Sequence, residues 1–97
     1  MNEKIFFDVK GNSMFPTFKD GESVCLEKYN NQFINKNDIV VCNHPLKKDF
    51  LIIKRVTKIK NQNKLFLEGD NISVLDSEDS HNFGYLDISK VIAIKRN

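Results

Sequence analysis

The sequence has no hydrophobic run long enough to cross a membrane as a helix. Its uninterrupted apolar segments, such as residues 39–42 and 51–53, are short, whereas a transmembrane helix needs about 18–20 apolar residues. The first residues of the chain also have too short an apolar segment to form a secretory signal peptide. The sequence therefore predicts a cytoplasmic chain without an integral membrane segment.

Cysteine and histidine are scarce, with two residues of each type. Cys25, Cys42, His44 and His81 do not have the spacing of any metal-binding motif, so we predict no metal site and no cofactor. Cys25 and Cys42 each lie in an apolar, strand-like segment, and we expect them to be buried free thiols in a reducing compartment, with a disulfide as the less favoured alternative. His44 precedes Pro45 in a predicted turn, which favours a structural role.

The chain also lacks an excess of charge of one sign. It carries 15 Lys and Arg residues against 13 Asp and Glu residues, a formal net charge of +2. This balance does not indicate a nucleic-acid or membrane-surface partner, and the basic run 58–64 is interpreted as a solvated hairpin tip. A chain of 97 residues supports one hydrophobic core, so we predict a single domain, 1–97. The sequence leaves the oligomeric state open.

Short alternating apolar segments separated by turn residues predict a mostly β protein. The expected strands are residues 5–9, 23–27, 38–42, 50–59, 64–68 and 91–95, with a hairpin turn at 61–63 and a short helical turn near 86–90. Residues 69–84 are expected to form a long loop, which is commonly functional in a compact domain. Such a pattern indicates a small coiled β-barrel or a folded sheet.

Two chemically suggestive residues occur in different contexts, Ser13 in the turn-like run Gly-Asn-Ser-Met-Phe-Pro-Thr and Lys54 in Ile-Ile-Lys-Arg-Val. A serine nucleophile needs a base, and a lysine can act as one only when it is neutral. Strand alternation places Lys54 between Ile52 and Val56 on an apolar face, with Arg55 on the opposite face. Burial there would lower the pKa of the amine.

The order of four short motifs resembles the signal peptidase I family of Ser/Lys proteases. These are Gly-x-Ser-Met-x-Pro-Thr, Lys-Arg-Val, Gly-Asp-Asn, and Ser-x-Asp-Ser-x-x-Phe-Gly, spread over residues 9–84. The resemblance implies the same small folded-sheet architecture, shared with the LexA-type catalytic domain. It further implies that Ser13 is the nucleophile and Lys54 the general base, with Met14 packed beside them.

The resemblance also assigns supporting roles. It implies that Ser77 orients the base, that Asp79 and Ser80 hold their loop in place, that residues 69–71 form a structural turn near the site, and that the Ser13 N–H is an oxyanion donor. The chain departs from the family pattern at Gly11, where many members carry a serine as a second oxyanion donor. It departs again at His81, where the family usually has an arginine that pairs with the residue matching Asp79.

Only twelve residues precede Ser13, so we expect a trimmed, soluble version of the family. The group known for this form consists of the nickel-type superoxide dismutase maturation proteases, which remove an N-terminal propeptide from a protein precursor. Three alternatives remain open. One is a self-cleaving repressor (LexA-type) peptidase domain, although these 97 residues contain no recognisable DNA-binding domain. Another is a non-catalytic peptide-binding β-domain. In the third, the chain acts only beside a membrane partner that presents the substrate.

Overall fold

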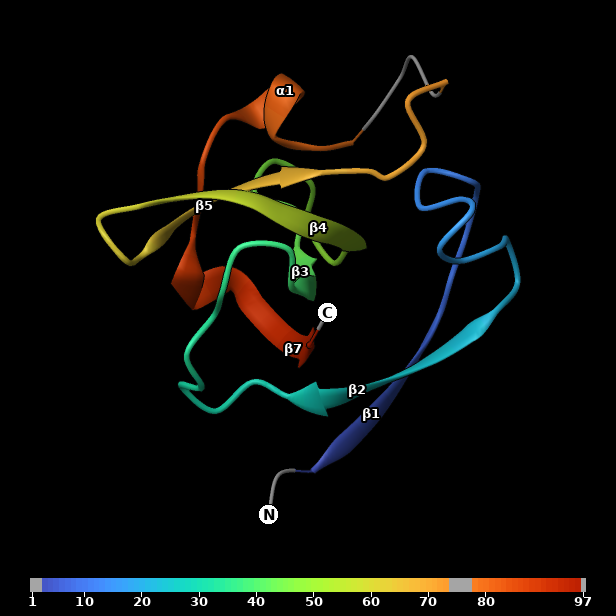
Figure 1. Ribbon diagram of the computed structural model, residues 1–97, viewed down its shortest axis with the longest axis horizontal. Helices are drawn as coiled ribbons and strands as arrows, with labels where there is room; N and C mark the ends of the chain where they lie inside the picture. The colour runs from blue at the N-terminus through green and yellow to red at the C-terminus, as the bar shows by residue number, and fades with distance from the viewer. Residues whose placement is uncertain (1–2, 74–77, 97) are drawn as a thin grey trace.

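The computed structural model describes residues 3–73 and 78–96, and its strands form one coiled sheet (Figure 1). The strands are β1 (Lys4–Asp8), β2 (Ser23–Lys28), β3 (Ile39–Asn43), β4 (Leu51–Lys60), β5 (Lys64–Glu68), β6 (Leu86–Asp87) and β7 (Val91–Lys95). A short helix α1 (Ser80–Phe83) precedes β6, and a 3-10 helix η1 (Ile88–Lys90) joins β6 to β7. This mostly β architecture confirms the predicted fold class.

The sheet has the strand order β1-β2-β7-β3-β4-β5-β6, and every neighbouring pair is antiparallel. The register shifts between Val41 and Cys42 in the β3–β7 pair and between Val56 and Lys58 in the β4–β5 pair. At a shift of this kind one strand carries an extra residue, which bends that strand and increases its twist. The sheet therefore curls, and residues of β1 and β4 line the same cleft although three strands separate them in the sheet order.

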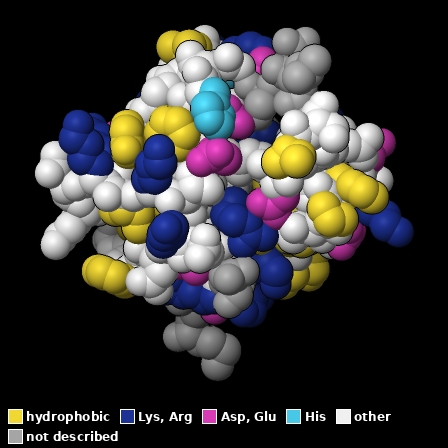
Figure 2. Space-filling model, turned by 45° about the horizontal axis from the view of Figure 1, so that its top comes forward, with side chains coloured by type: hydrophobic (Ala, Val, Ile, Leu, Met, Phe, Trp, Pro, Cys, Tyr) yellow, Lys and Arg dark blue, Asp and Glu magenta, His cyan; other side chains and the backbone are white. Residues whose placement is uncertain are grey.

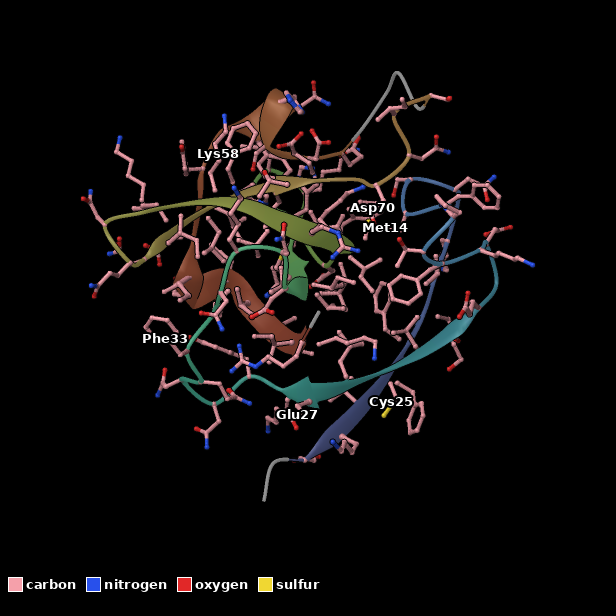
Figure 3. All side chains as sticks on the ribbon, in the orientation of Figure 1. Met14, Cys25, Glu27, Phe33, Lys58 and Asp70 are labelled. Carbon is pink, nitrogen blue, oxygen red and sulfur yellow. The ribbon has the colours of Figure 1, made fainter. Side chains whose placement is uncertain are left out.

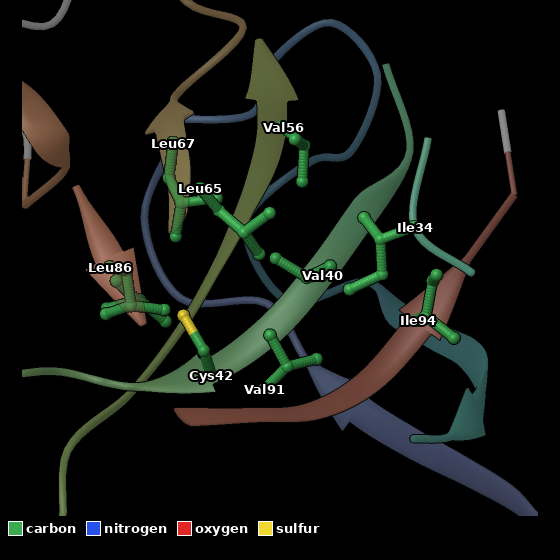
Figure 4. Close-up of a cluster of buried hydrophobic side chains, with 10 residues drawn as sticks. Ile34, Val40, Cys42, Val56, Leu65, Leu67, Leu86, Val91 and Ile94 are labelled. Carbon is green, nitrogen blue, oxygen red and sulfur yellow. The ribbon is translucent and has the colours of Figure 1, made fainter. Parts of the chain in front are cut away.

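The core consists of two hydrophobic clusters on opposite faces of the central strands. On β4, Ile52 and Val56 belong to the first cluster and Ile53 to the second, as strand alternation predicts. Figure 4 shows members of the first cluster, which contains Ile34, Val40, Cys42, Ile52, Val56, Leu65, Leu67, Leu86, Val91 and Ile94. The second cluster contains Val9, Met14, Phe18, Val24, Leu26, Ile39, Val41, Ile53 and Ala93.

Two structural expectations from the sequence are wrong. Residues 69–84 contain helix α1, which begins after Asp79 because that carboxylate accepts a hydrogen bond from the backbone N–H of His81 and caps the turn. Cys25 is exposed, while Cys42 is buried as expected, and both thiols are free. Val24 and Leu26 point into the core, so alternation directs Cys25 outward, as Figure 3 shows.

Positive and negative side chains are interspersed on the face shown in Figure 2, in line with the balanced composition. No helix in residues 3–73 and 78–96 is long and apolar enough to span a membrane.

Candidate active site

Ser13 lies in the connection between β1 and β2, which hydrogen bonds hold in a fixed shape. The Gly11 N–H donates to Asp20 Oδ1 at 2.7 Å, and Gly11 has a φ of +82°, a conformation that glycine adopts readily. The Phe18 N–H donates to the Met14 carbonyl at 2.9 Å. Met14 is fully buried in the second cluster, so the residue after the serine anchors the turn in the core.

Lys54 reaches this turn from the middle of β4. The residue is only 3% exposed, and its Nζ lies 2.8 Å from Ser13 Oγ. This distance lies within the hydrogen-bonding range required between a nucleophile and its base. The structure thus brings together the two residues that the sequence singled out from segments far apart in the chain.

The environment of Lys54 favours its neutral form. Burial lowers the pKa of the amine from its ordinary value, while the negative charges of Asp79 and Glu78 oppose that shift. The lowered pKa shows that desolvation outweighs these carboxylates. Sequence reasoning anticipated the burial but not the two carboxylates, which lie far from Lys54 in the chain.

Cys42 lies on the same face of the sheet as Lys54 and contributes no negative charge near neutral pH. Burial raises the pKa of the Cys42 thiol to about 12, although the charge of Lys54 acts in the opposite direction. The thiol is therefore protonated at neutral pH. Cys42 acts there as a small apolar side chain in the first cluster, which supports the dry surroundings of the amine.

Residues 69–71 fasten the serine turn from the other side. The Asn71 N–H donates to the Ser13 carbonyl at 2.9 Å, and Asn71 Nδ2 donates to the Asn12 carbonyl at the same distance. A Cβ atom on Gly69 would lie 2.6 Å from the Ser13 carbonyl oxygen. A glycine is needed at 69 because the two backbones approach too closely for any side chain.

Asp70 connects the same segment to the opposite face of β4. Arg55 Nε and a terminal guanidinium nitrogen donate to its two carboxylate oxygens, each at 2.8 Å, and Thr17 Oγ1 donates at 2.5 Å. Burial acts to raise the pKa of Asp70, but the bonds from Arg55 and Thr17 lower it overall. The bond to Thr17 places Asp70, labelled in Figure 3, beside the turn that holds the nucleophile. The sequence indicated the Gly-Asp-Asn turn but not its partner Arg55.

Asp79 and Ser80 are both buried and lie at the start of α1. The Ser80 hydroxyl accepts a hydrogen bond from the Leu67 N–H at 2.8 Å, which ties the helix to β5. Asp79 Oδ1 lies 3.2 Å from His81 Nδ1, so the His81 ring is a partner of this carboxylate. Ser77, the predicted orienting serine, lies outside the described residues.

A cleft of about 500 Å³ opens beside Ser13 and Lys54. Its walls come from the end of β1 and the following turn, from the start of β4 with the preceding turn, and from Glu78. The lining residues are Phe7, Asp8, Lys10, Gly11, Asn12, Ser13, Asp49, Phe50, Leu51, Ile52, Ile53, Lys54 and Glu78. The Gly11 N–H that borders this cleft already donates to Asp20. It is therefore not directed at a bound group in this conformation.

Among the described residues, no cluster of three or more His, Cys, Asp or Glu side chains could hold a metal ion. The chemistry that the site offers is that of a hydroxyl beside a buried amine, bordered by a cleft. This arrangement suits nucleophilic attack on a carbonyl group.

Comparison with known proteins agrees with this chemistry. The family model described as "Signal peptidase, peptidase S26" matches residues 4–59, more than half of the chain. The matched range includes Ser13, Lys54 and the turn that carries Met14, whereas Asp79 and Ser80 lie beyond it. No curated protein matches the chain. The family match therefore establishes that the chain belongs to the signal peptidase family, peptidase S26.

Proposed function

We propose that the chain is a serine endopeptidase in which Ser13 is the nucleophile and Lys54 the general base. The observation that carries this proposal is the 2.8 Å distance from Lys54 Nζ to Ser13 Oγ, made by an amine that burial drives toward its neutral form. Membership in the peptidase S26 family gives independent support for a serine peptidase.

The reaction begins when neutral Lys54 accepts the hydroxyl proton of Ser13. Ser13 Oγ attacks the scissile carbonyl carbon, and the backbone N–H of Ser13 stabilises the resulting oxyanion. The ammonium group of Lys54 then gives its proton to the leaving amine as the peptide bond breaks. Lys54 next removes a proton from a water molecule, which hydrolyses the acyl-enzyme and restores the hydroxyl. Proton transfer of this kind contributes about 10²–10⁴ in rate, and an oxyanion donor about 10²–10³.

The cleft is suited to an extended peptide because a strand edge borders it on each side. In the described part of the chain, β1 pairs only with β2. Residues 51–54 of β4 pair with β3 on one side, while the pairing of β4 with β5 begins only at Arg55. A substrate segment lying between these edges can add to the sheet through main-chain hydrogen bonds. This mode presents a backbone carbonyl to Ser13 with little demand on side-chain identity.

For the substrate, we propose an N-terminal propeptide on a nickel-type superoxide dismutase precursor. This choice is supported by the resemblance of the motifs to the signal peptidase I family, of which the maturation proteases for that enzyme are a trimmed form. The nickel ion would belong to the mature substrate and not to this chain.

The test is to mix the purified chain with such a precursor and to read the new N-terminus by mass spectrometry. We expect one cleavage, which Ser13→Ala and Lys54→Ala each abolish while the fold remains. Matched controls are Ser23→Ala on β2 and Lys60→Ala on β4, both exposed residues outside the cleft, which should retain the wild-type rate.

The pH dependence checks the base. Lys54 is inactive when protonated, so the rate should rise with pH through its lowered pKa and reach a plateau below the ordinary value of 10.5. Near-normal activity in Lys54→Ala, or a rate that is flat from pH 6 to 10, would show that Lys54 is not the base. If the nickel-type precursor stays intact while another peptide is cut in a Ser13-dependent way, only the substrate assignment fails.

A further inference from the structure

His44 occupies a buried position behind the cleft, in the turn that leads from β3 to β4. Its side chain is only 4% exposed. The ring contacts Phe50 and Phe83 edge-on, with ring centroids 5.7 Å and 5.0 Å away. Its backbone N–H donates to the Phe50 carbonyl at 2.8 Å. Packing and backbone pairing thus fix the orientation of the imidazole.

The hydrogen bonds of the ring define its tautomer. The Leu46 N–H donates to His44 Nδ1 at 3.1 Å, so Nδ1 acts as an acceptor. In the neutral ring the proton then resides on Nε2. His44 Nε2 lies 2.6 Å from Glu78 Oε2 and donates its hydrogen to this carboxylate. A buried, oriented donor therefore holds Glu78 from one side.

Glu78 connects His44 to the candidate active site. It lines the cleft together with Ser13 and Lys54, and it directly precedes the buried Asp79. Its other oxygen, Oε1, lies 2.9 Å from Lys47 Nζ, but the Lys47 side chain is 53% exposed and the Glu78 side chain 39% exposed. An exposed pair of this kind contributes little, so the buried imidazole is the stronger determinant of where Glu78 lies.

We propose that His44 is a positioning residue, which holds the Glu78 carboxylate on the cleft wall and thereby fixes the backbone that carries Asp79 beside Lys54. This inference rests on the proposed Ser13/Lys54 function. It adds to that function a contact between two segments that the sequence did not connect.

The carboxylate of Glu78 and its bond to His44 have separable effects. The titratable groups that act on Lys54 are Asp79, Cys42 and Glu78, and the charge of Glu78 raises the pKa of the amine. Glu78→Gln keeps an oxygen that can accept from His44 but removes the charge. His44→Phe keeps the aromatic contacts and the charge but removes the donor, so Glu78 can move away from the cleft wall.

The experiment measures acylation of Ser13 by p-nitrophenyl acetate, a small ester that requires no peptide recognition, with Ser13→Ala as the background. The pKa of Lys54 is followed in parallel by NMR titration of its side-chain nitrogen. We expect both Glu78→Gln and His44→Phe to move the rising limb of the rate and the NMR titration to lower pH. On that limb Glu78→Gln should raise the rate about twofold.

Of these two variants, only His44→Phe should also lower the plateau rate, by about three- to tenfold, because the segment that carries Asp79 loses its anchor. The double variant should show no larger pH shift than either single variant, since both remove the same influence. If His44→Phe does not fold, Glu78→Ala replaces it, because this change removes the same hydrogen bond at its partly exposed partner. Lys47→Gln is the matched control and should leave both readouts at wild-type values.

Wild-type pH limbs and plateaus in both His44→Phe and Glu78→Ala would overturn the proposal. An equal effect of Lys47→Gln would also overturn it, because Lys47 and not His44 would then hold Glu78. If wild-type Ser13 is not acylated at all, the proposed function fails and this inference fails with it. If wild-type Ser13 is acylated normally but His44→Phe and Glu78→Ala both behave like wild type, the inference about His44 fails while the proposed function stands.

Discussion

The two faces of strand β4 carry adjacent basic side chains in opposite surroundings. Lys54 is buried on the face of the first cluster, and its amine lies beside the Ser13 hydroxyl. Arg55, on the other face, makes two hydrogen bonds to the carboxylate of Asp70. Burial lowers the pKa of Lys54, whereas the hydrogen bond to Asp70 raises the pKa of Arg55.

Because of this difference, Lys54 is suited to act as a base, whereas Arg55 is suited to a structural role. A guanidinium stays charged and binds a carboxylate through two parallel bonds, which makes it a good structural clamp. An amine can lose its proton when it is desolvated, which makes it a usable base. The Arg55–Asp70 pair holds the segment that fastens the Ser13 turn, while Lys54 faces the hydroxyl itself. One strand therefore supplies both the base and the scaffold that positions the nucleophile.

The largest expected effect on activity comes from Gly69→Ala, which disturbs the contact between segment 69–71 and the backbone of Ser13. The new Cβ would lie 2.6 Å from the Ser13 carbonyl oxygen, so the backbone of the nucleophile must shift. We expect the rate of Ser13 acylation to fall about 100-fold, since small misplacements of reacting groups have effects of this size.

Gly21→Ala is the matched control for this change. Gly21 has a positive φ, of +86°, and an added Cβ there meets nothing within 4 Å. This control should lose stability through backbone strain and keep the rate per folded molecule. Equal rates for the two variants would show that the close approach of Gly69 does not position Ser13.

Asp70→Asn tests the supporting face of β4. The Arg55 and Asp70 side chains are 18% and 15% exposed, so Asp70→Asn takes away the negative charge that compensates a largely buried guanidinium. We expect the free energy of unfolding, measured by denaturant titration at neutral pH, to fall by about 2–4 kcal/mol.

The pH dependence of this loss has a defined sign. The folded-state pKa of Asp70 is lowered, so its contribution is present above the unfolded value of about 3.9 and disappears as the pH falls through the folded pKa. Glu27→Gln, which removes the exposed pair with Lys4, is the control and should change stability little. If Asp70→Asn lowers the free energy of unfolding no more than this control does, the Arg55–Asp70 pair does not stabilise the fold.

The smallest expected effect concerns the stability cost of the desolvated amine. Lys54→Met removes a buried ionisable group, and we expect the melting temperature to rise by several degrees at neutral pH. Each unit by which the pKa is lowered corresponds to about 1.4 kcal/mol, and about 1 kcal/mol shifts Tm by roughly 4–8 °C in a domain of this size.

The sign of this effect follows from proton binding. The pKa of Lys54 is lower in the folded state, so the unfolded chain binds the proton more tightly and wild-type stability rises with pH between the two values. The Tm difference between Lys54→Met and wild type should therefore narrow as the pH approaches about 10.4. Lys95→Met, at an exposed end of β7, serves as the control. A difference independent of pH would show that desolvation of Lys54 does not cause the effect.

The strands were largely predictable because alternation of apolar residues records which side chains face the core. The segments 64–68 and 91–95 were predicted with their observed bounds, and the other long strands differ by one residue at one or both ends. Helix α1 was missed because its single turn depends on the Asp79 cap and on the bond between Ser80 and Leu67. Neither contact leaves a periodic pattern in four residues.

The candidate site divides in the same way. Ser13 and Lys54 were identified from local motifs, and burial of the lysine followed from its apolar neighbours. The bonds from Arg55 to Asp70 and from His44 to Glu78 join segments that are distant in the chain. No local pattern marks such pairs, because which side chains meet depends on how the sheet curls.

The sequence by itself determined the fold class, the strand positions and the two residues proposed for the reaction, because apolar alternation and short motifs are local properties. The tertiary structure alone decided that a hydroxyl and an amine lie 2.8 Å apart, and which carboxylates surround that amine. The physical reason is that the pKa of a buried group depends on its desolvation and on nearby charges. Both are set by segments that only the folded sheet brings together.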